Sequence, residues 1–332
     1  MSARSFFQFK YDSLEDVTSP LLSGKQFHLF SPNIYEHDAV SRHLLETAAF
    51  LERSGANVTL YCDGCIDDDR NWIQSTQKLI ERQYTKNDAL LYFFSIGHAI
   101  FDSVKQLDCK KILYFHGVTP PELIEKDFPL AAQYCQLGYQ QLEDIYHFDA
   151  FAANSLYTKN SIVNKSKDRP VSYLPPFIDM EWWNDLVECK PKTANALESS
   201  NIKLLYVGRI FPHKNIIEML TVVNSLKELE PSVCLFIVGF GHSEDYLNKV
   251  KTFIDDQELN SNVIFFEDVS DAELKWFYAN SNALINFSAH EGFGVPFVEA
   301  MKFKLPIDTY EVAAIPFTVV SYGAICGSKE PR

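Results

Sequence analysis

Two glutamates flank a glycine-containing stretch late in the 332-residue chain, in the order Glu291-Gly-Phe-Gly-Val-Pro-Phe-Val-Glu299. Pro296 suits the first position of a helix, so the stretch predicts a loop that leads into a helix. The backbone N–H groups of the Gly-Phe-Gly turn would then lie at a helix N-terminus, which is a natural binding site for an anion. An acidic first helical turn would explain Glu299, but it leaves Glu291 and the glycines unexplained.

A second stretch, Gly208-Arg-Ile-Phe-Pro-His-Lys214, follows the apolar run 203–207. The helix macrodipole opposes a lysine at a helix N-terminus, so the position of Lys214 is easier to understand if an anion binds nearby. A planar guanidinium at Arg209 and the point charge of Lys214 could together hold a diphosphate. The loop alone supports equally well the alternative that both are solvated surface charges.

Short apolar runs alternate with helical patterns along the whole chain. The runs cover residues 26–30, 57–61, 89–94, 111–115, 149–153, 171–174, 203–207, 233–238, 262–266 and 283–287, and the clearest helical patterns cover 37–53, 215–230, 243–257, 271–280 and 296–303. This alternation predicts an α/β chain with parallel sheets covered on both faces. We expect two Rossmann-like domains, residues 1–176 and 201–332, joined by a linker over 177–200.

In such sheets ligands bind beyond the carboxyl ends of the strands. Both charged stretches follow predicted strands, as does Gly239-Phe-Gly-His-Ser243, whose glycines permit either a close approach to a ligand or only a tight turn. We therefore expect all three loops at one edge of the second sheet, with the two domains facing each other across a cleft.

Composition excludes several classes of function. The chain has 44 acidic and 30 basic residues, a net charge of -14 and no basic run, which argues against nucleic acid as a partner. Its first residues lack the apolar core of a signal peptide, and no apolar run approaches the ~20 residues of a membrane helix. We expect a cytoplasmic protein whose seven dispersed cysteines are reduced, with Cys62-Asp-Gly-Cys65 as a turn and no bound metal.

At this point the sequence resembles a known family. Val207-Gly-Arg-Ile-Phe-Pro-His-Lys214, together with Glu291-Gly-Phe-Gly-Val-Pro-Phe-Val-Glu-Ala-Met301, is similar to the donor half of the retaining glycosyltransferases of family four, which have the GT-B architecture and are also called glycosyl transferases group 1. Residues 114–122 and 153–159 resemble the acceptor-side loops of that family. The resemblance covers roughly residues 25–330, and the combination of motifs is far more specific than any one of them.

The resemblance implies a role for each matching residue. His116 and Glu291 would contact the transferred sugar and are the catalytic candidates. Further donor contacts would come from Arg209 and Lys214 at the diphosphate, Glu299 at the ribose, Val269 beside the base, and the amides of Gly292, Phe293 and Gly294.

The resemblance also implies a reaction. A sugar would move from a nucleoside-diphosphate sugar to a saccharide or lipid-linked acceptor in surface polysaccharide biosynthesis. Transfer would proceed on one face of the sugar, with no protein nucleophile, cofactor or metal. Two alternatives stay open, namely a catalytically weak donor-binding or partner subunit and a GT-B-like sugar-nucleotide epimerase. Peripheral contact with the inner face of a membrane is compatible with either acceptor.

Two features of the sequence depart from the family pattern. The first loop, 31–40, lacks the glycine pair that family members often carry, so acceptor contacts there are left open. Family members usually continue for several dozen residues beyond the glutamate helix, whereas this sequence ends at Arg332. We therefore expect an incomplete second domain.

Overall fold

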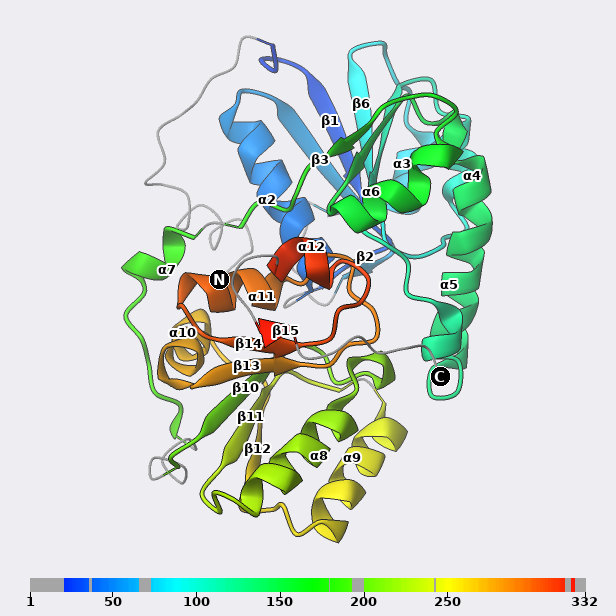
Figure 1. Cartoon of the computed structure of the whole chain (residues 1–332). Coiled ribbons are helices and arrows are strands. Elements are labelled where there is room, and N and C mark those ends of the chain that lie inside the picture. Colours follow the sequence, from blue (N-terminus) through cyan, green and yellow to red (C-terminus); the bar gives the residue numbers. More distant parts are fainter. Residues whose placement is uncertain are drawn as a thin grey trace. The chain divides into compact units, whose positions relative to one another are not determined.

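The computed structural model describes residues 21–35, 38–65, 73–178, 180–192, 200–241, 243–319 and 324–325. The chain forms two compact units (Figure 1). The first contains the chain up to Thr119 together with Tyr134–Ile178, and the second contains Pro120–Gln133 together with the chain from Asp179 onward. The sequence ending that suggested an incomplete domain, residues 326–332, lies outside the described residues.

The first unit is built on a parallel sheet, whose described strands follow the order β5-β3-β1-β6-β7-β8-β9. These strands are β1 (Gln26–Phe30), β3 (Asn57–Cys62), β5 (Ile73–Ser75), β6 (Asp88–Phe94), β7 (Lys110–Phe115), β8 (Ala150–Ala153) and β9 (Val171–Tyr173). A separate pair joins β2 (Asn33–Ile34) to β4 (Gly64–Cys65). All of the predicted runs in this half are strands, whereas the short strands β2, β4 and β5 were not predicted.

Helices cover both faces of this sheet. The α-helices are α2 (Ala39–Arg53), α3 (Thr76–Glu81), α4 (Phe101–Lys105), α5 (Pro129–Gln141) and α6 (Leu156–Ile162), and the division between the two units falls within α5. Asp38 caps α2 by accepting a hydrogen bond from the backbone N–H of Ser41 at 2.9 Å. The apolar face of α2 packs on alternate residues of the central strands, including Leu29 and Phe93.

The second unit contains a parallel sheet whose described strands follow the order β12-β11-β10-β13-β14-β15. They are β10 (Lys203–Val207), β11 (Cys234–Val238), β12 (Val263–Phe266), β13 (Ala283–Asn286), β14 (Ile307–Thr309) and β15 (Ala324–Ile325). In chain order this is the 3-2-1-4-5-6 arrangement of a Rossmann fold, and the order reverses between β10 and β13. The loops that follow these two strands therefore flank the point where ligands bind in this fold.

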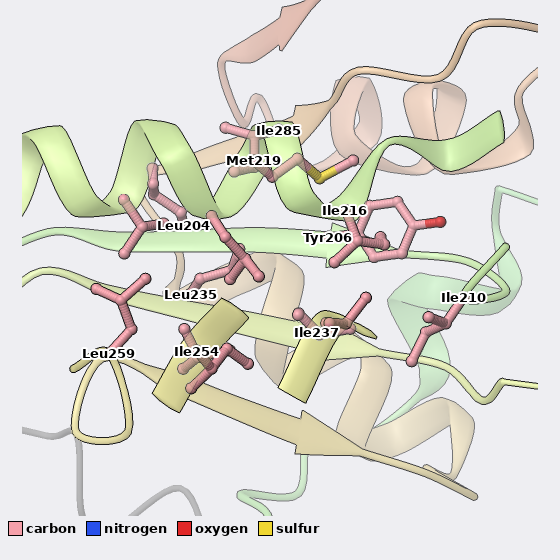
Figure 2. Close-up of a cluster of buried hydrophobic side chains, with 14 of the residues drawn as sticks. Leu204, Tyr206, Ile210, Ile216, Met219, Leu235, Ile237, Ile254, Leu259 and Ile285 are labelled. Carbon is pink, nitrogen blue, oxygen red and sulfur yellow. The ribbon is translucent and has the colours of Figure 1, made fainter. Parts of the chain in front are cut away.

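Its helices are α7 (Trp182–Asp185), α8 (Ile216–Lys227), α9 (Glu244–Asp256), α10 (Asp271–Asn280), α11 (Val295–Lys302) and α12 (Ile315–Val319). Helices α8 and α9 lie on one face of the sheet, and α10, α11 and α12 lie on the other (Figure 1). Strand residues alternate between the two cores. Tyr206 and Ile237 point into the α8–α9 core, which Figure 2 shows, while Leu205 and Phe236 point into the other.

Part of the predicted linker packs on the second unit. Trp183 of α7 is fully buried in the core of the second unit, and the backbone N–H of Cys189 donates to the carbonyl oxygen of Ala272 at 3.0 Å. The first part of the segment 177–200 therefore packs on the second unit, because its aromatic side chain has an apolar site to fill. Residues 193–199 lie outside the described part of the chain, and the domain boundaries given by the sequence stay a prediction.

Among the described residues, no helix combines the length and the apolar character that crossing a membrane requires.

Candidate functional site

Two loops at the reversal of strand order are tied together. The loop after β10 ends in a short 3₁₀ turn, Pro212–Lys214, and then in Asn215, which has a left-handed backbone with φ 53°. The Asn215 side chain donates to the carbonyl oxygen of Phe287 at 2.8 Å, and the backbone N–H of Ala289 donates to the carbonyl oxygen of His213 at 2.7 Å. These bonds join the loop after β10 to the loop after β13. Both loops therefore lie at one edge of the second sheet, as predicted from the sequence.

Lys214 and Glu291 form an ion pair across these loops. Lys214 Nζ is 2.6 Å from Glu291 Oε1, and each side chain is only 13% exposed. Burial pushes the pKa of Glu291 upward, but the charge and hydrogen bond of Lys214 and the hydroxyl of Ser288 outweigh it, so that the pKa lies below its usual value. The site therefore holds an ionised carboxylate against a lysine. The sequence placed both residues in the site but did not predict this pairing.

Two buried polar residues support Glu291. Ser288 Oγ lies 2.8 Å from Glu291 Oε1 and 2.5 Å from Asn286 Oδ1, and its single hydroxyl proton can be donated to only one of them at a time. Asn286 Oδ1 also accepts from the backbone N–H of Ser288 at 2.9 Å. Neither residue was predicted from the sequence. Asn286 could have been noticed as a polar residue within the apolar run 283–287, because a buried amide needs hydrogen-bond partners.

The Gly-Phe-Gly turn leads into α11 as expected, but the helix begins one residue earlier than predicted. Gly294 precedes the helix with φ 89°, and a Cβ atom there would lie 2.4 Å from the ring of Phe297, so the position requires glycine. The helix begins at Val295, which makes Pro296 its second residue instead of its first. The Thr318 hydroxyl of α12 donates to the carbonyl oxygen of Phe293 at 2.7 Å, so a helix that the sequence did not predict helps to hold the turn.

Glu299 lies deeper than the other predicted donor contacts. Its side chain is on the buried side of α11, and its Oε2 accepts a hydrogen bond from the Tyr278 hydroxyl at 2.7 Å. Tyr278 in turn packs edge-on against Trp183. Val269, expected beside the base, lies in the loop before α10 and is partly buried against the same core. The predicted contact of Glu299 with a ribose therefore involves a carboxylate that already has a protein partner.

Arg209 differs from Lys214 in being exposed. Its guanidinium lies over the ring of Phe211, 5.3 Å from the centroid, and Phe211 stacks on Phe128 with centroids 4.2 Å apart. The Tyr206 hydroxyl donates to the carbonyl oxygen of Arg209 at 2.8 Å and fixes the backbone. The site thus contains one lysine held by a carboxylate and one arginine that rests on an aromatic surface.

Two buried histidines that the sequence analysis did not single out adjoin these charges. Burial, followed by the charges of Lys214, Arg209 and His290, lowers the pKa of His213 to about 2. Burial also lowers the pKa of His290 to about 4. Both rings are therefore neutral near pH 7, and the charged side chains of the loops 208–215 and 287–294 are Arg209, Lys214 and Glu291.

A glycine after β11 allows the loop after β10 to pack closely against it. Gly239 has φ 139°, and a Cβ atom there would lie 2.1 Å from the carbonyl oxygen of Gly208. The close approach that the sequence allowed at this loop is thus an approach to another backbone segment. Of the stretch 239–243, His242 lies outside the described residues.

His116 belongs to the first unit, at the end of β7, and the other predicted site residues belong to the second. Its backbone N–H donates to the carbonyl oxygen of Phe94 at 2.9 Å, and burial lowers the pKa of its imidazole to about 3. It is therefore a neutral hydrogen-bonding group. Its expected contact with a donor sugar stays a prediction.

The arrangement suits the binding of an anion better than nucleophilic attack. The ionised Glu291 carboxylate, its partner Lys214 and the start of α11 adjoin the turn, and Arg209 lies on the same loop as Lys214. In the described ranges, no group of three or more His, Cys, Asp or Glu side chains is placed so that it could hold a metal ion.

Comparisons with known proteins agree with these features. The family model described as "Glycosyl transferases group 1" matches residues 190–327. The chain is 35% identical over 121 residues to the O-antigen chain mannosyltransferase RfbU of Salmonella typhimurium, covering 36% of this chain and 33% of the relative. It is 27% identical over 248 residues to the serotype-specific mannosyltransferase WbdA of Escherichia coli, covering 68% of this chain and 29% of the relative. The chain thus spans about a third of these curated relatives.

Solved structures share the fold over most of the chain. Anabaena HepE in complex with UDP-glucose has a TM-score of 0.69 at 13% identity, with coverage of 92% of this chain and 86% of that one. WaaG, a glycosyltransferase involved in lipopolysaccharide biosynthesis, has a TM-score of 0.64 at 16% identity, with coverage of 90% and 85%. The predicted α/β fold with two Rossmann-like units is therefore confirmed as the GT-B fold. Residues 190–327 of the chain resemble the glycosyl transferases group 1 family, whose model they match.

Proposed function

We propose that the chain is a retaining glycosyltransferase that moves a sugar from a nucleoside-diphosphate sugar to a saccharide or lipid-linked acceptor in surface polysaccharide biosynthesis. The observation that carries this proposal is the Lys214–Glu291 pair at the reversal of strand order, with Arg209 on the same loop as Lys214. The mannosyltransferase names of two relatives support a polysaccharide product. We place the reaction in the cytoplasm, with peripheral contact at the inner face of a membrane if the acceptor is lipid-linked.

Donor binding would use the Lys214–Glu291 ion pair, which is already formed without a ligand. A diphosphate offers Lys214 a second anion, which lets the ammonium share its hydrogen bonds between phosphate and Glu291. Glu291 can then accept from a hydroxyl of the transferred sugar while Ser288 keeps it in place. Arg209 would clamp the diphosphate from the exposed side, and the amides of Gly292, Phe293 and Gly294 would complete the anion site at α11.

The remaining donor contacts follow from the same placement. Glu299 would accept a hydrogen bond from the ribose, Val269 would pack beside the base, and His116 would contact the sugar. During transfer the leaving diphosphate gains charge, and prepositioned cations and amides stabilise it. The departing phosphate would help to deprotonate the acceptor hydroxyl on the same face of the sugar.

We also propose that the reaction is independent of metal and cofactor, because Arg209, Lys214 and the α11 amides can neutralise a diphosphate. Activity should survive EDTA at a concentration in excess of all divalent cations. The measurement is sugar transfer or donor hydrolysis after chelation, compared with the same sample supplied with manganese. Complete loss in EDTA that manganese restores would contradict this mechanism.

A ligand panel tests the proposed function. Binding to the native state alone raises the melting temperature, so a thermal-shift series with UDP, GDP, ADP, UDP-glucose, GDP-mannose and ADP-glucose identifies the base and sugar. The stabilising donor then enters transfer and hydrolysis assays. Turnover with retained configuration is the expected result. Binding without turnover would instead favour a donor-binding subunit, and an epimerised nucleotide sugar would favour the epimerase.

A further inference from the structure

Two buried histidines meet in the first unit. His43 lies on α2 and His116 follows β7, and His43 Nδ1 is 3.3 Å from His116 Nε2. The side chains belong to residues that are 2% and 7% exposed. Nothing in the sequence motifs singled out His43, which occupies the buried face of an amphipathic helix.

Neighbouring groups fix both residues. The ring of Tyr114 lies 4.7 Å from that of His43, perpendicular to it, and 5.0 Å from that of His116. Phe93 also packs against both rings. The side chain of Asn154 donates to the carbonyl oxygen of His116 at 3.3 Å. The two imidazoles are thus held in contact by aromatic packing and by backbone hydrogen bonds.

Both rings are neutral, which limits how they can bond. Burial lowers the pKa of His43 to about 2, with the nearby His116 as a smaller cause, and lowers that of His116 to about 3. A neutral imidazole has one N–H donor and one acceptor nitrogen, so a single proton lies between the two facing nitrogens. Neutral imidazole side chains intrinsically favour the proton on Nε2. Both histidines keep that tautomer if His116 Nε2–H donates to His43 Nδ1.

We propose that His43 is a positioning residue for His116, whose Nε2–H donates to His43 Nδ1 and whose Nδ1 is thereby fixed as an acceptor for a hydroxyl of the transferred sugar. This inference rests on the proposed function, because the donor contact of His116 gives the fixed acceptor its purpose. It adds a residue of α2 to the functional machinery and defines the direction of one hydrogen bond.

Nitrogen NMR on the full ¹⁵N-labelled chain tests the bond directly. Long-range ¹H–¹⁵N spectra report the tautomer of each of the nine histidines, and the His43→Phe variant assigns the pair. The expected spectrum has His116 protonated at Nε2, His43 unprotonated at Nδ1, and a coupling between these two nitrogens across the hydrogen bond. A proton on His116 Nδ1, or the absence of that coupling, would overturn the proposal. Because this measurement uses the wild-type chain, it tests the direction of the hydrogen bond even if a variant fails to fold.

Two variants separate positioning from packing. His43→Phe keeps an aromatic ring beside Tyr114 and Phe93 but removes the acceptor, whereas His43→Gln restores an acceptor without the ring. With UDP-glucose or GDP-mannose as the probe, kcat for donor hydrolysis should fall by about three- to tenfold in His43→Phe, the range expected for one lost hydrogen bond. His43→Gln should retain more activity, and neither variant should change the affinity for UDP or GDP.

The outcomes distinguish this inference from the proposed function. Equal losses of kcat in both variants, or a parallel loss of nucleoside-diphosphate affinity, would indicate packing alone and would overturn the positioning role. If no donor is turned over even by the wild-type chain, the proposed function fails, and with it the purpose assigned to His43. The NMR spectrum would still report whether the histidine bond exists.

Discussion

At the scale of single residues, the charges of the site are already paired before a ligand binds. Lys214 and Glu291 are far apart in sequence, but their loops follow adjacent strands, and both side chains are mostly buried. Arg209 is exposed and rests on Phe211. The two cations are therefore expected to respond differently to substitution, although the sequence treated them as equivalent.

Lys214→Ala should destabilise the protein because it leaves the carboxylate of Glu291 mostly buried without its counterion. Breaking such a pair costs about 2–4 kcal/mol of unfolding free energy, allowing for the remaining exposure. Urea unfolding measures this cost. Arg209→Ala is the matched control and should change stability by under about 0.5 kcal/mol.

A double variant checks the cause. In a Glu291→Gln background no buried charge is left uncompensated, so Lys214→Ala should cost much less. A cost that is the same in both backgrounds would mean that the ion pair contributes nothing and that Lys214 acts only through packing.

At the scale of elements, backbone geometry at the sheet edge sets the positions of the loops. Gly239 follows β11 with a left-handed φ, and its Cα lies against the backbone of Gly208 in the loop after β10. A parallel bridge between Ile210 and Gly241 continues this contact. The loop that carries Arg209 and Lys214 is therefore positioned from both sides, by β11 and by β13.

Gly239→Ala should destabilise the protein by about 1–3 kcal/mol, because alanine is strained at this φ and its Cβ would collide with a carbonyl oxygen. The displaced loop should also bind UDP or GDP more weakly. Gly241→Ala is the control, since its Cβ would meet only ordinary contacts, the nearest being Ile210 at 3.5 Å. If thermal melts and nucleotide titrations rank the two variants alike, the close approach does not position the loop.

Most of the strands could be predicted from the sequence. Every predicted apolar run is a strand, with ends within one residue, because fully buried parallel strands appear as continuous apolar segments. The three-residue β14 and the five-residue α12 were missed, since neither is long enough to show periodicity. The bonds of Ser288 to Glu291 and of Tyr278 to Glu299 could not be predicted, because these pairs form only through tertiary contacts.

At the scale of the whole molecule, buried neutral histidines occur in both units. Burial lowers the pKa of His28, and it lowers those of His43, His116, His213 and His290 to between about 2 and about 4. Their usual value is 6.5. Below that pH the unfolded chain binds protons that the native state does not, so the unfolding free energy falls as pH decreases.

Stability should therefore decline from about pH 6.5 downward, well before carboxylates titrate. Each histidine that is neutral only in the native state contributes about 1.4 kcal/mol per pH unit. Glu291, whose pKa is lowered, adds a further loss only below its usual value of 4.5. Urea unfolding between pH 8 and pH 5 measures this slope, which His213→Gln should reduce. A stability that stays constant down to pH 4.5 would show that these histidines are not buried in neutral form.

The most direct test of the central claim is calorimetry on the donor site, with the wild type, Arg209→Ala and Glu291→Gln titrated with a nucleoside, its diphosphate and its diphosphate sugar. The base is the one that stabilises the wild type. Arg209→Ala should lose about ten- to a hundredfold in affinity for the diphosphate, the value of a charge-assisted hydrogen bond, and little for the nucleoside. Glu291→Gln should keep its affinity for the diphosphate, because Lys214 remains, and bind the nucleotide sugar less well. Equal affinities of all three proteins for all three ligands would contradict the assignment of this site.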